Sequence, residues 1–294
     1  MKFYKYQGAG NDFLIADNRD GHIVEKDGVL VAFLPDGTSW RGVISEMCDR
    51  RYGIGADGLM LLENASETEG ADFRMVYYNS DGSGGMMCGN GGRCMVAFAA
   101  DCGITGFDFI AADGFHTAQV LSSEGKSKVI RLQMKDVTEI RRYMSLEGTS
   151  VPSVGNFLDT GTRHYVRMVE DLEHYDVVSE GRDIRYNAIS LLPVGANVNF
   201  VEPESGVLKV RTYEKGVEDE TYACGTGIVA SSVAAYNEGI SPSEVFEDGR
   251  VRYDVTALRD NLCVDFRPGD SEGCVASEVF LTGPATYVAE IVFE

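Results

Sequence analysis

A Cys-Gly-x-Gly element occurs twice in this chain, and each copy precedes a stretch of small and apolar residues. The copies are CGNG at 88–91 and CGTG at 224–227. Fifteen residues after each cysteine stands a glycine followed by isoleucine, Gly103 and Gly239, where a helix would end in a left-handed residue. Upstream, GADGLMLLE at 55–63 is similar to GANVNFVE at 195–202. We interpret these matches as an internal repeat, which predicts two similar α/β halves.

The hydrophobic pattern predicts a strand-rich chain with few helices. Residues 92–101 and 227–237 are small or apolar nearly all round, which is typical of helices enclosed on every side. A third helix is predicted at 39–50, because Trp40, Val43, Ile44 and Met47 recur at helical spacing behind Ser39 as a possible N-cap. Short β-branched and aromatic runs predict strands at 73–78, 129–134, 164–169, 207–213, 251–256, 262–267 and 286–293.

Composition excludes several classes of function. The 294 residues are 44% hydrophobic and 24% charged, as in soluble globular proteins of one or two domains. The net charge of −20 disfavours nucleic acid and anionic membrane surfaces as partners. We find neither an export signal nor an apolar run long enough to span a membrane, so we expect a cytoplasmic protein. The seven cysteines form no CxxC pair, so we expect neither structural zinc nor a disulfide framework.

A cysteine at the start of a helix is suited to acid/base chemistry. The positive end of the helix dipole lowers a thiol pKa from about 8.5 to as little as about 3.5–7.5. The backbone amides of Gly89, Asn90, Gly225 and Thr226 would bind an anion such as a carboxylate. If the two halves face each other across a cleft, Cys88 and Cys224 would remove a proton from one face of a ligand and deliver one to the other. A carbon next to a carboxylate inverts by this route.

Each cysteine has alternative interpretations. A single buried cysteine is more often a small structural hydrophobe than a catalytic group. A non-catalytic protein that binds carboxylates would keep the glycines but would not need two reactive thiols. GTGIVA at 225–230 fits the dinucleotide pattern G-x-G-x-x-A, but it lies far from the preceding strand and CGNGGR at 88–93 fails the pattern. We therefore expect no cofactor and no metal.

The chain resembles the diaminopimelate epimerases. The resemblance rests on QGAGNDF, CDRRYGIGADGL, YNSDGSGGMMCGNGGRC, LPVGANVNFVE, YEKGVEDETYACGTG and LTGPAT, which together extend over nearly the whole chain. It implies an α/β (α+β) fold of two pseudo-symmetric domains, each a curled, mostly antiparallel sheet around a central buried helix. The implied domains are 1–135 with 283–294, which contains Cys88, and 136–282, which contains Cys224. The resemblance also implies a homodimer.

The resemblance assigns roles to residues around the two cysteines. Cys88 and Cys224 would be the thiolate and thiol of a two-base mechanism, with His164 and Glu214 beside them as catalytic residues. Gly89, Asn90, Gly225 and Thr226 would hold the reacting carboxylate. The other implied substrate-binding residues are Asn11, Asn79, Thr162, Asn197, Glu214 and Lys215. Taken alone, Asn11 and Asn79 would be turn residues and His164 a core histidine.

The sequence departs from the family pattern near the distal end of the substrate. Gly-Asn-Pro-His is replaced by Gly161-Thr162-Arg163-His164, and Glu-Arg by Glu214-Lys215. Lysine offers a point charge where arginine offers a two-pronged grip. As a hypothesis, Arg163 takes over part of that grip.

The sequence thus predicts a cofactor-independent epimerase of LL- and meso-diaminopimelate, in lysine and peptidoglycan precursor biosynthesis. The alternatives are a proline-type or histidine-type racemase of the same fold, or a carboxylate-binding protein. A phenazine-type isomerase fits less well, because those enzymes lack the paired cysteines.

Overall fold

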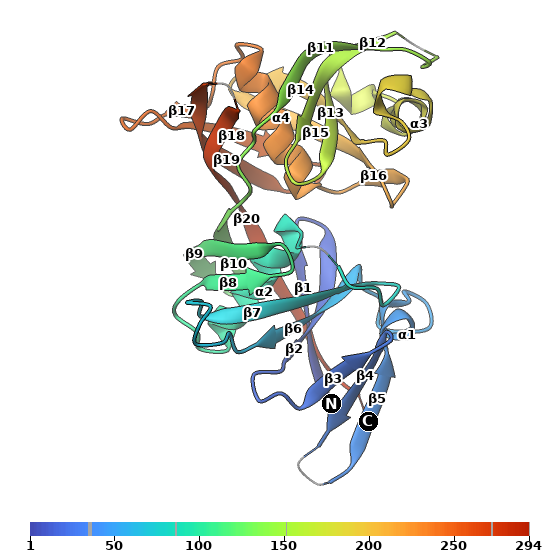
Figure 1. Cartoon of the computed structure of the whole chain (residues 1–294), viewed down its shortest axis with the longest axis vertical. Helices are drawn as coiled ribbons and strands as arrows, with labels where there is room; N and C mark the ends of the chain where they lie inside the picture. Colours follow the sequence, from blue (N-terminus) through green and yellow to red (C-terminus); the bar gives the residue numbers. More distant parts are fainter. Residues whose placement is uncertain (35–36, 86, 151, 272, 294) are drawn as a thin grey trace. The chain divides into compact units, whose positions relative to one another are not determined.

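A computed structural model describes residues 1–34, 37–85, 87–150, 152–271 and 273–293. The chain divides into two compact units: unit 1 consists of 1–132 and 284–294, and unit 2 of 133–283 (Figure 1). The last strand, β20 (Cys274–Val292), contributes residues to both units.

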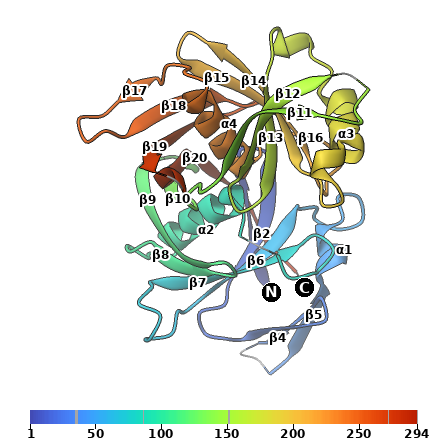
Figure 2. The same ribbon diagram turned by 45° about the horizontal axis from the view of Figure 1, so that its top comes forward.

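Unit 1 is a closed barrel. Its strands pair in the cyclic order β1, β2, β6, β7, β8, β9, β10, β20 and back to β1. Their bounds are β1 (Lys2–Gly8), β2 (Asn11–Asp17), β6 (Gly58–Glu63), β7 (Phe73–Asn79), β8 (Asp108–Ala111), β9 (Gly114–Glu124) and β10 (Ser127–Gln133). Two of these pairings, β2–β6 and β7–β8, are parallel and the other printed registers are antiparallel. The barrel encloses α2 (Gly89–Asp101), whose residues 89–99 are all buried (Figure 2).

Unit 2 repeats the same order of pairings. Parallel β13–β14 and β15–β18 correspond to β2–β6 and β7–β8, and antiparallel β14–β15, β18–β19 and β19–β20 correspond to β6–β7, β8–β9 and β9–β10. The bounds are β11 (Ile140–Leu146), β12 (Ser153–Asp159), β13 (Arg163–Met168), β14 (Asn197–Glu204), β15 (Val207–Glu214), β16 (Asp219–Thr221), β17 (Glu244–Val245), β18 (Val251–Thr256) and β19 (Asn261–Ser271). These strands curl around α4 (Gly225–Asn237), which is buried over most of its length (Figure 1).

The two central helices begin and end alike because their sequences repeat. Each starts directly after the cysteine of its Cys-Gly-x-Gly element, and each is followed by a left-handed glycine, Gly103 (φ +84°) or Gly239 (φ +78°). A side chain at such a positive φ would be strained, so glycine ends the helix here. The predicted fold class is confirmed: curled, mostly antiparallel sheets surround two enclosed helices.

Unit 2 carries additional helices on the other face of its sheet. α3 (Val177–Asn187) begins at Asp176, whose carboxylate accepts a hydrogen bond from the Ser179 amide at 3.1 Å, as an N-cap does. Two short 3₁₀ helices, η1 (Leu172–His174) and η2 (Ile189–Leu191), flank it. Leu172, Val177, Ile184 and Leu191 from this layer join Phe157 and Tyr165 from the sheet in one buried cluster. The sheet of unit 2 therefore buries both faces.

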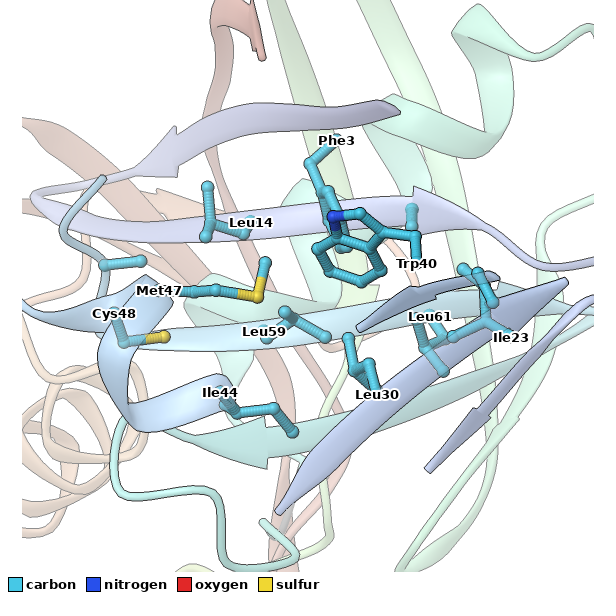
Figure 3. Close-up of a cluster of buried hydrophobic side chains, with 13 residues drawn as sticks. Phe3, Leu14, Ile23, Leu30, Trp40, Ile44, Met47, Cys48, Leu59 and Leu61 are labelled. Atoms are coloured by element: carbon cyan, nitrogen blue, oxygen red, sulfur yellow. The ribbon is translucent and has the colours of Figure 1, made fainter. Parts of the chain in front are cut away.

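The predicted helix at 39–50 is wrong. Residues 39–43 form β5 (Ser39–Val43), which joins β3 (Ile23–Lys26) and β4 (Val29–Phe33) in a small separate sheet, and only α1 (Ile44–Cys48) is helical. Trp40, Ile44 and Met47 still face one core, which Figure 3 shows with Phe3 and Leu59. A β-carbon on Gly42 would lie 2.3 Å from the Trp40 ring, so the ring packs directly against this glycine in the strand. Residues 39–43 form a strand because they pair with β4 and because Gly42 would weaken a helix. These two effects outweigh the helical spacing of the apolar residues.

Candidate active site

In unit 1, the candidate site is built at the start of α2. Cys88 is the N-cap residue, and its Sγ accepts a hydrogen bond from the Gly91 amide at 3.2 Å. Gly89 and Asn90 form the first turn, and both are buried. A β-carbon on Gly91 would lie 3.2 Å from the Cys88 sulfur, which is a tight contact. Glycine at this position therefore leaves room for the thiol to pack against the first turn of α2.

A line of side-chain amides joins this helix start to β2 and β6. Arg93, fully buried, donates through Nη2 to Asn90 Oδ1 at 2.8 Å. Asn90 Nδ2 donates to Asn11 Oδ1 at 2.6 Å, and Asn11 Nδ2 donates to Asp57 Oδ2 at 2.9 Å. Because a guanidinium only donates and a carboxylate only accepts, the two ends fix the orientation of both amides. The structure thus brings the predicted residues Asn11 and Asn90 together.

Charged groups surround the far end of this line. Arg50 reaches Asp12 and Asp57, each at 2.6 Å, and Lys5 contacts Asp12 at 2.8 Å. Burial by itself raises the pKa of Asp12, but the hydrogen bonds and charges of Arg50 and Lys5 outweigh it and leave that pKa below its ordinary value. The start of α2 around Cys88 is therefore supported by side chains of acidic and basic residues.

Asn79, the remaining predicted residue of unit 1, ends β7. Its backbone amide bonds to the Ser83 carbonyl at 2.9 Å, and its Nδ2 donates to Ser83 Oγ at 3.0 Å. These contacts are those of a turn residue. Its predicted role in binding a substrate stays a prediction.

In unit 2, Cys224 precedes α4 and is 7% exposed. Its Sγ lies 3.5 Å from Thr226 Oγ1. The Thr226 hydroxyl lies 3.0 Å from His164 Nε2 and 3.1 Å from Thr162 Oγ1, and Thr162 Oγ1 lies 2.9 Å from the same nitrogen. The structure therefore brings four predicted residues together at this helix start.

His164 is neutral at physiological pH. Its side chain is completely buried on β13, and burial lowers its pKa to about 3. Its Nδ1 lies 3.0 Å from the Asn199 amide nitrogen, and Thr212 Oγ1 donates to Asn199 Oδ1 at 3.0 Å. The start of α4 around Cys224 is thus supported by neutral hydrogen-bonding groups.

The other predicted residues of unit 2 lie where β14 and β15 meet. Asn197 Nδ2 donates to the Arg163 carbonyl at 3.2 Å, and its Oδ1 accepts from the Lys215 amide at 2.9 Å. Glu214 accepts a hydrogen bond from Thr221 Oγ1 at 2.9 Å. The Lys215 side chain is exposed. Asn197 thus ties two strand ends together through the backbone.

Arg163 points away from this group. Successive side chains of a strand alternate between faces, so Arg163 lies opposite its neighbour His164. Its guanidinium lies over the Phe157 ring, 5.1 Å from the centroid, and donates to the Leu191 carbonyl at 3.3 Å. Both partners belong to the cluster beneath α3. The geometry does not support the hypothesis that Arg163 grips a ligand near the start of α4.

Sequence reasoning missed four residues that position the predicted ones: Arg93, Asp57, Asn199 and Thr212. Each lies inside or beside a motif that carries the family resemblance: Arg93 in CGNGGRC, Asp57 in GADG, Asn199 in ANVNF and Thr212 before YEKG. Asn199 stands within the apolar run 198–201, and Thr212 continues the alternate positions of Leu208 and Val210, so each is a polar residue at a position that predicts burial and a buried hydrogen bond. That signal was available in the sequence.

Comparison with solved structures defines the fold. A probable proline racemase from Agrobacterium radiobacter, solved with bound carbonate, superposes with a TM-score of 0.70 over all of this chain and 92% of its own, at 14% identity. A phenazine biosynthesis protein of the PhzF family from Bacillus anthracis superposes with a TM-score of 0.67 over all of this chain and 99% of its own, also at 14% identity. The chain thus has the fold of these two proteins. In the described part of the chain, helices fall short of the length and apolar character needed to cross a membrane.

Sequence comparison then narrows the class. The family model described as diaminopimelate epimerase matches residues 3–130. A diaminopimelate epimerase from Flavobacterium psychrophilum is 41% identical over 293 residues, covering 99% of both chains. The chain belongs to the diaminopimelate epimerase family, so the resemblance noted in the sequence is confirmed.

Proposed function

We propose that this protein is an isomerase that interconverts LL- and meso-diaminopimelate without a cofactor, in the synthesis of lysine and peptidoglycan precursors. The observation that carries the proposal is the duplicated helix start, at which Cys88 and Cys224 occupy the same position in two units of equal topology. Membership of the family over nearly the whole chain supports this choice of substrate.

The proposed mechanism uses both thiols on one α-carbon. One cysteine, as thiolate, removes the α-proton, and the other, as thiol, delivers its proton to the opposite face. The amides of Gly89, Asn90, Gly225 and Thr226 bind the carboxylate into which the carbanion charge spreads. Two helix ends at up to about 2 kcal/mol each supply roughly 4 kcal/mol, or about a thousandfold in rate. Fixed hydrogen bonds and desolvation supply the rest.

The remaining assignments are part of the proposal. Asn11, Asn79, Asn197 and Thr162 orient the substrate, and Lys215 binds its distal carboxylate. His164 and Glu214 act as catalytic residues beside the two cysteines, and Glu214 also contacts the substrate. We retain 1–135 with 283–294 and 136–282 as the domains, and a cytoplasmic homodimer as the form of the enzyme. Since Arg163 faces the other side of the sheet, Lys215 is the cation that we assign to the distal carboxylate.

Incubation with separate candidate amino acids in deuterated water tests the choice of substrate. The proposal predicts that LL- and meso-diaminopimelate gain α-deuterium and interconvert, while proline and histidine do not. A non-catalytic carboxylate binder would exchange none of them. Exchange of proline or histidine, with diaminopimelate unchanged, would replace the proposal by one of the racemase alternatives.

A further inference from the structure

The buried polar group behind His164 determines which of its nitrogens carries the proton. Asn199 lies on β14, fully buried, and is held between β13, β15 and the first turn of α4. Its Nδ2 faces two groups, His164 Nδ1 at 3.0 Å and the Tyr165 carbonyl at 3.3 Å. Its Oδ1 accepts from Thr212 Oγ1 at 3.0 Å. All polar positions of this side chain are thus used within unit 2.

The Tyr165 carbonyl decides how the Asn199 amide is oriented. A backbone carbonyl can only accept, so the atom that faces it must be the NH₂ group. The reversed amide would place its oxygen 3.3 Å from the carbonyl oxygen, so that two acceptors would face each other with no hydrogen between them. Since the same NH₂ group faces His164 Nδ1, that nitrogen must accept. The proton of the neutral ring therefore resides on Nε2.

This tautomer sets the direction of the hydroxyls at the start of α4. With a proton on Nε2, the ring donates to the hydroxyl pair of Thr162 and Thr226. The hydroxyl hydrogens are then directed onward, from Thr162 to Thr226 at 3.1 Å and from Thr226 to the Cys224 sulfur at 3.5 Å. With the proton on Nδ1 instead, Nε2 would accept one of these hydrogens and draw the donor away from the sulfur.

We propose that Asn199 and Thr212 are positioning residues of the epimerase reaction, which hold His164 as the Nε2–H tautomer and so aim the Thr226 hydroxyl at Cys224 as a hydrogen-bond donor. In this arrangement His164 transfers no proton itself. It is a neutral donor that stabilises the Cys224 thiolate through one intervening hydroxyl. This inference rests on the proposed function.

Packing explains why the amide stays in place. A β-carbon on Gly227 would lie 2.3 Å from Asn199 Oδ1, so the helix backbone presses directly against the amide. Thr160, from the loop before β13, donates to the Thr226 carbonyl at 3.2 Å and fixes the helix start from the other side. The route from Thr212 to Cys224 thus runs through groups with little freedom to rotate.

Nitrogen NMR of ¹⁵N-histidine-labelled full-length protein tests the tautomer directly. The chain has four histidines, and the His164 signals are assigned by their loss in His164→Gln. We expect Nε2 protonated and Nδ1 unprotonated, with no titration between pH 5 and pH 8. Asn199→Asp presents an acceptor to Nδ1, so we expect the proton to move to Nδ1 or the ring to become charged. A wild-type protein with its proton on Nδ1 would overturn the inference.

Steady-state kinetics test the consequence for turnover. We expect Asn199→Asp to lower kcat at least tenfold and Thr212→Val to lower it threefold to tenfold, with KM changed less than threefold in both. Thr212→Ser, which keeps the hydroxyl, should recover most of the loss. Ser153→Ala is the matched control, because Ser153 is equally buried and bonds to the Tyr165 hydroxyl at 3.1 Å without touching His164.

The two proposals fail in different ways. Wild-type protein that interconverts the diaminopimelates establishes the reaction, and unchanged kcat in Asn199→Asp and Thr212→Val would then overturn the positioning role alone. Because the NMR readout needs no substrate, the tautomer is decided separately from the identity of the substrate. Thr212→Val removes a single hydroxyl without changing shape, so it serves if Asn199→Asp does not fold.

Discussion

The helix starts at Cys88 and Cys224 share a scaffold, but different groups support the two thiols. In unit 1, Arg93, Asp57, Arg50 and Lys5 surround the amides next to α2, and the hydrogen bonds run from a cation to a carboxylate. In unit 2, the groups behind α4 are hydroxyls, an amide and a neutral imidazole. The repeat therefore preserves where the cysteine sits relative to its helix, while the electrostatics around it have diverged.

Equivalent positions show how the divergence arose in the sequence. Arg93 and Val229 each follow their cysteine by five residues, and Asn90 and Thr226 each follow by two. A long cation fits behind α2 because it can donate to the Gly89 carbonyl at 3.2 Å as well as to Asn90. Val229 at the same place in α4 is buried and its side chain has no polar atom, so the polar support comes from strands β13, β14 and β15 instead. This contrast yields four predictions.

Removal of the Arg93 cation should have the largest effect, and only in unit 1. Arg93→Met keeps most of the volume but leaves the buried Asn90 Oδ1 and Gly89 carbonyl without this donor, which costs about 3 kcal/mol in free energy of unfolding. Trp40 is the single tryptophan and lies in the unit 1 core, so its fluorescence during urea unfolding reports on this unit. Hydrogen exchange of α4 should stay unchanged. An equal loss of protection in α4 would show that the two helix starts are not independent.

The two helix starts should also respond to different ranges of pH. The pKa of His164 is lowered to about 3 from its ordinary 6.5, so below pH 6.5 the unfolded chain takes up a proton that the folded chain does not. The stability from this group is present above pH 6.5 and is lost as pH falls toward 3. The loss is about 2 kcal/mol at pH 5. In Asp12 the pKa lies below its ordinary 3.8, so its stabilisation is lost only below that pH.

Unfolding at pH 7 and pH 5 measures this difference. Protection of α4 and β13 amides should fall at pH 5, while the urea midpoint reported by Trp40 changes much less. In His164→Gln the fall in unit 2 protection should be about 2 kcal/mol smaller. If protection in His164→Gln fell by as much as in the wild-type protein, this histidine would be ruled out as the cause.

Gly91 and Gly227 occupy equivalent positions, so adding a β-carbon at each one compares how tightly the two helix starts are packed. In Gly227→Ala the new β-carbon would lie 2.3 Å from Asn199 Oδ1, and overpacking of this kind costs about 1–3 kcal/mol. In Gly91→Ala the nearest atom is the Cys88 sulfur at 3.2 Å, which a small shift accommodates. We therefore expect Gly227→Ala to lower the thermal midpoint more than Gly91→Ala. Equal midpoints would contradict the rigid placement of Asn199.

Arg163→Ala should have the smallest effect. Its guanidinium covers Phe157 on the far face of the sheet, where a cation–π contact is worth about 0.5–1 kcal/mol. We expect KM for diaminopimelate to stay within twofold of wild type and the thermal midpoint to fall slightly. A tenfold rise in KM would restore the hypothesis that Arg163 grips the substrate.

The sequence predicted those parts of the fold that depend on local pattern. The enclosed helices follow from residues that are small or apolar all round, and the left-handed glycines mark their ends. The helix at 39–50 was wrong because Trp40 and Ile44 face one core whether the chain between them is strand or helix. Spacing alone does not distinguish these cases, and the pairing of β5 with β4 decides between them.

The candidate site was predicted unevenly for a similar reason. Motifs identified residues at helix starts, such as Cys88 and Thr226, where function and backbone geometry coincide. Asn199 acts through contacts with residues far apart from it in the sequence, as it does with His164. Such contacts depend on strand register, which one sequence does not reveal. The same register places Arg163 on the face opposite His164.

Isotope incorporation during the first turnovers tests the central claim, that two different thiols serve one carbon. LL-diaminopimelate is incubated in deuterated water and stopped before a tenth has reacted. We expect deuterium at the α-carbon of the meso product and almost none in the recovered LL substrate, because the abstracted proton and the delivered deuteron belong to different cysteines. We also expect Cys88→Ala and Cys224→Ala each to lower turnover by about 10²–10⁴-fold. Equal labelling of substrate and product, or a single variant with intact turnover, would contradict the claim.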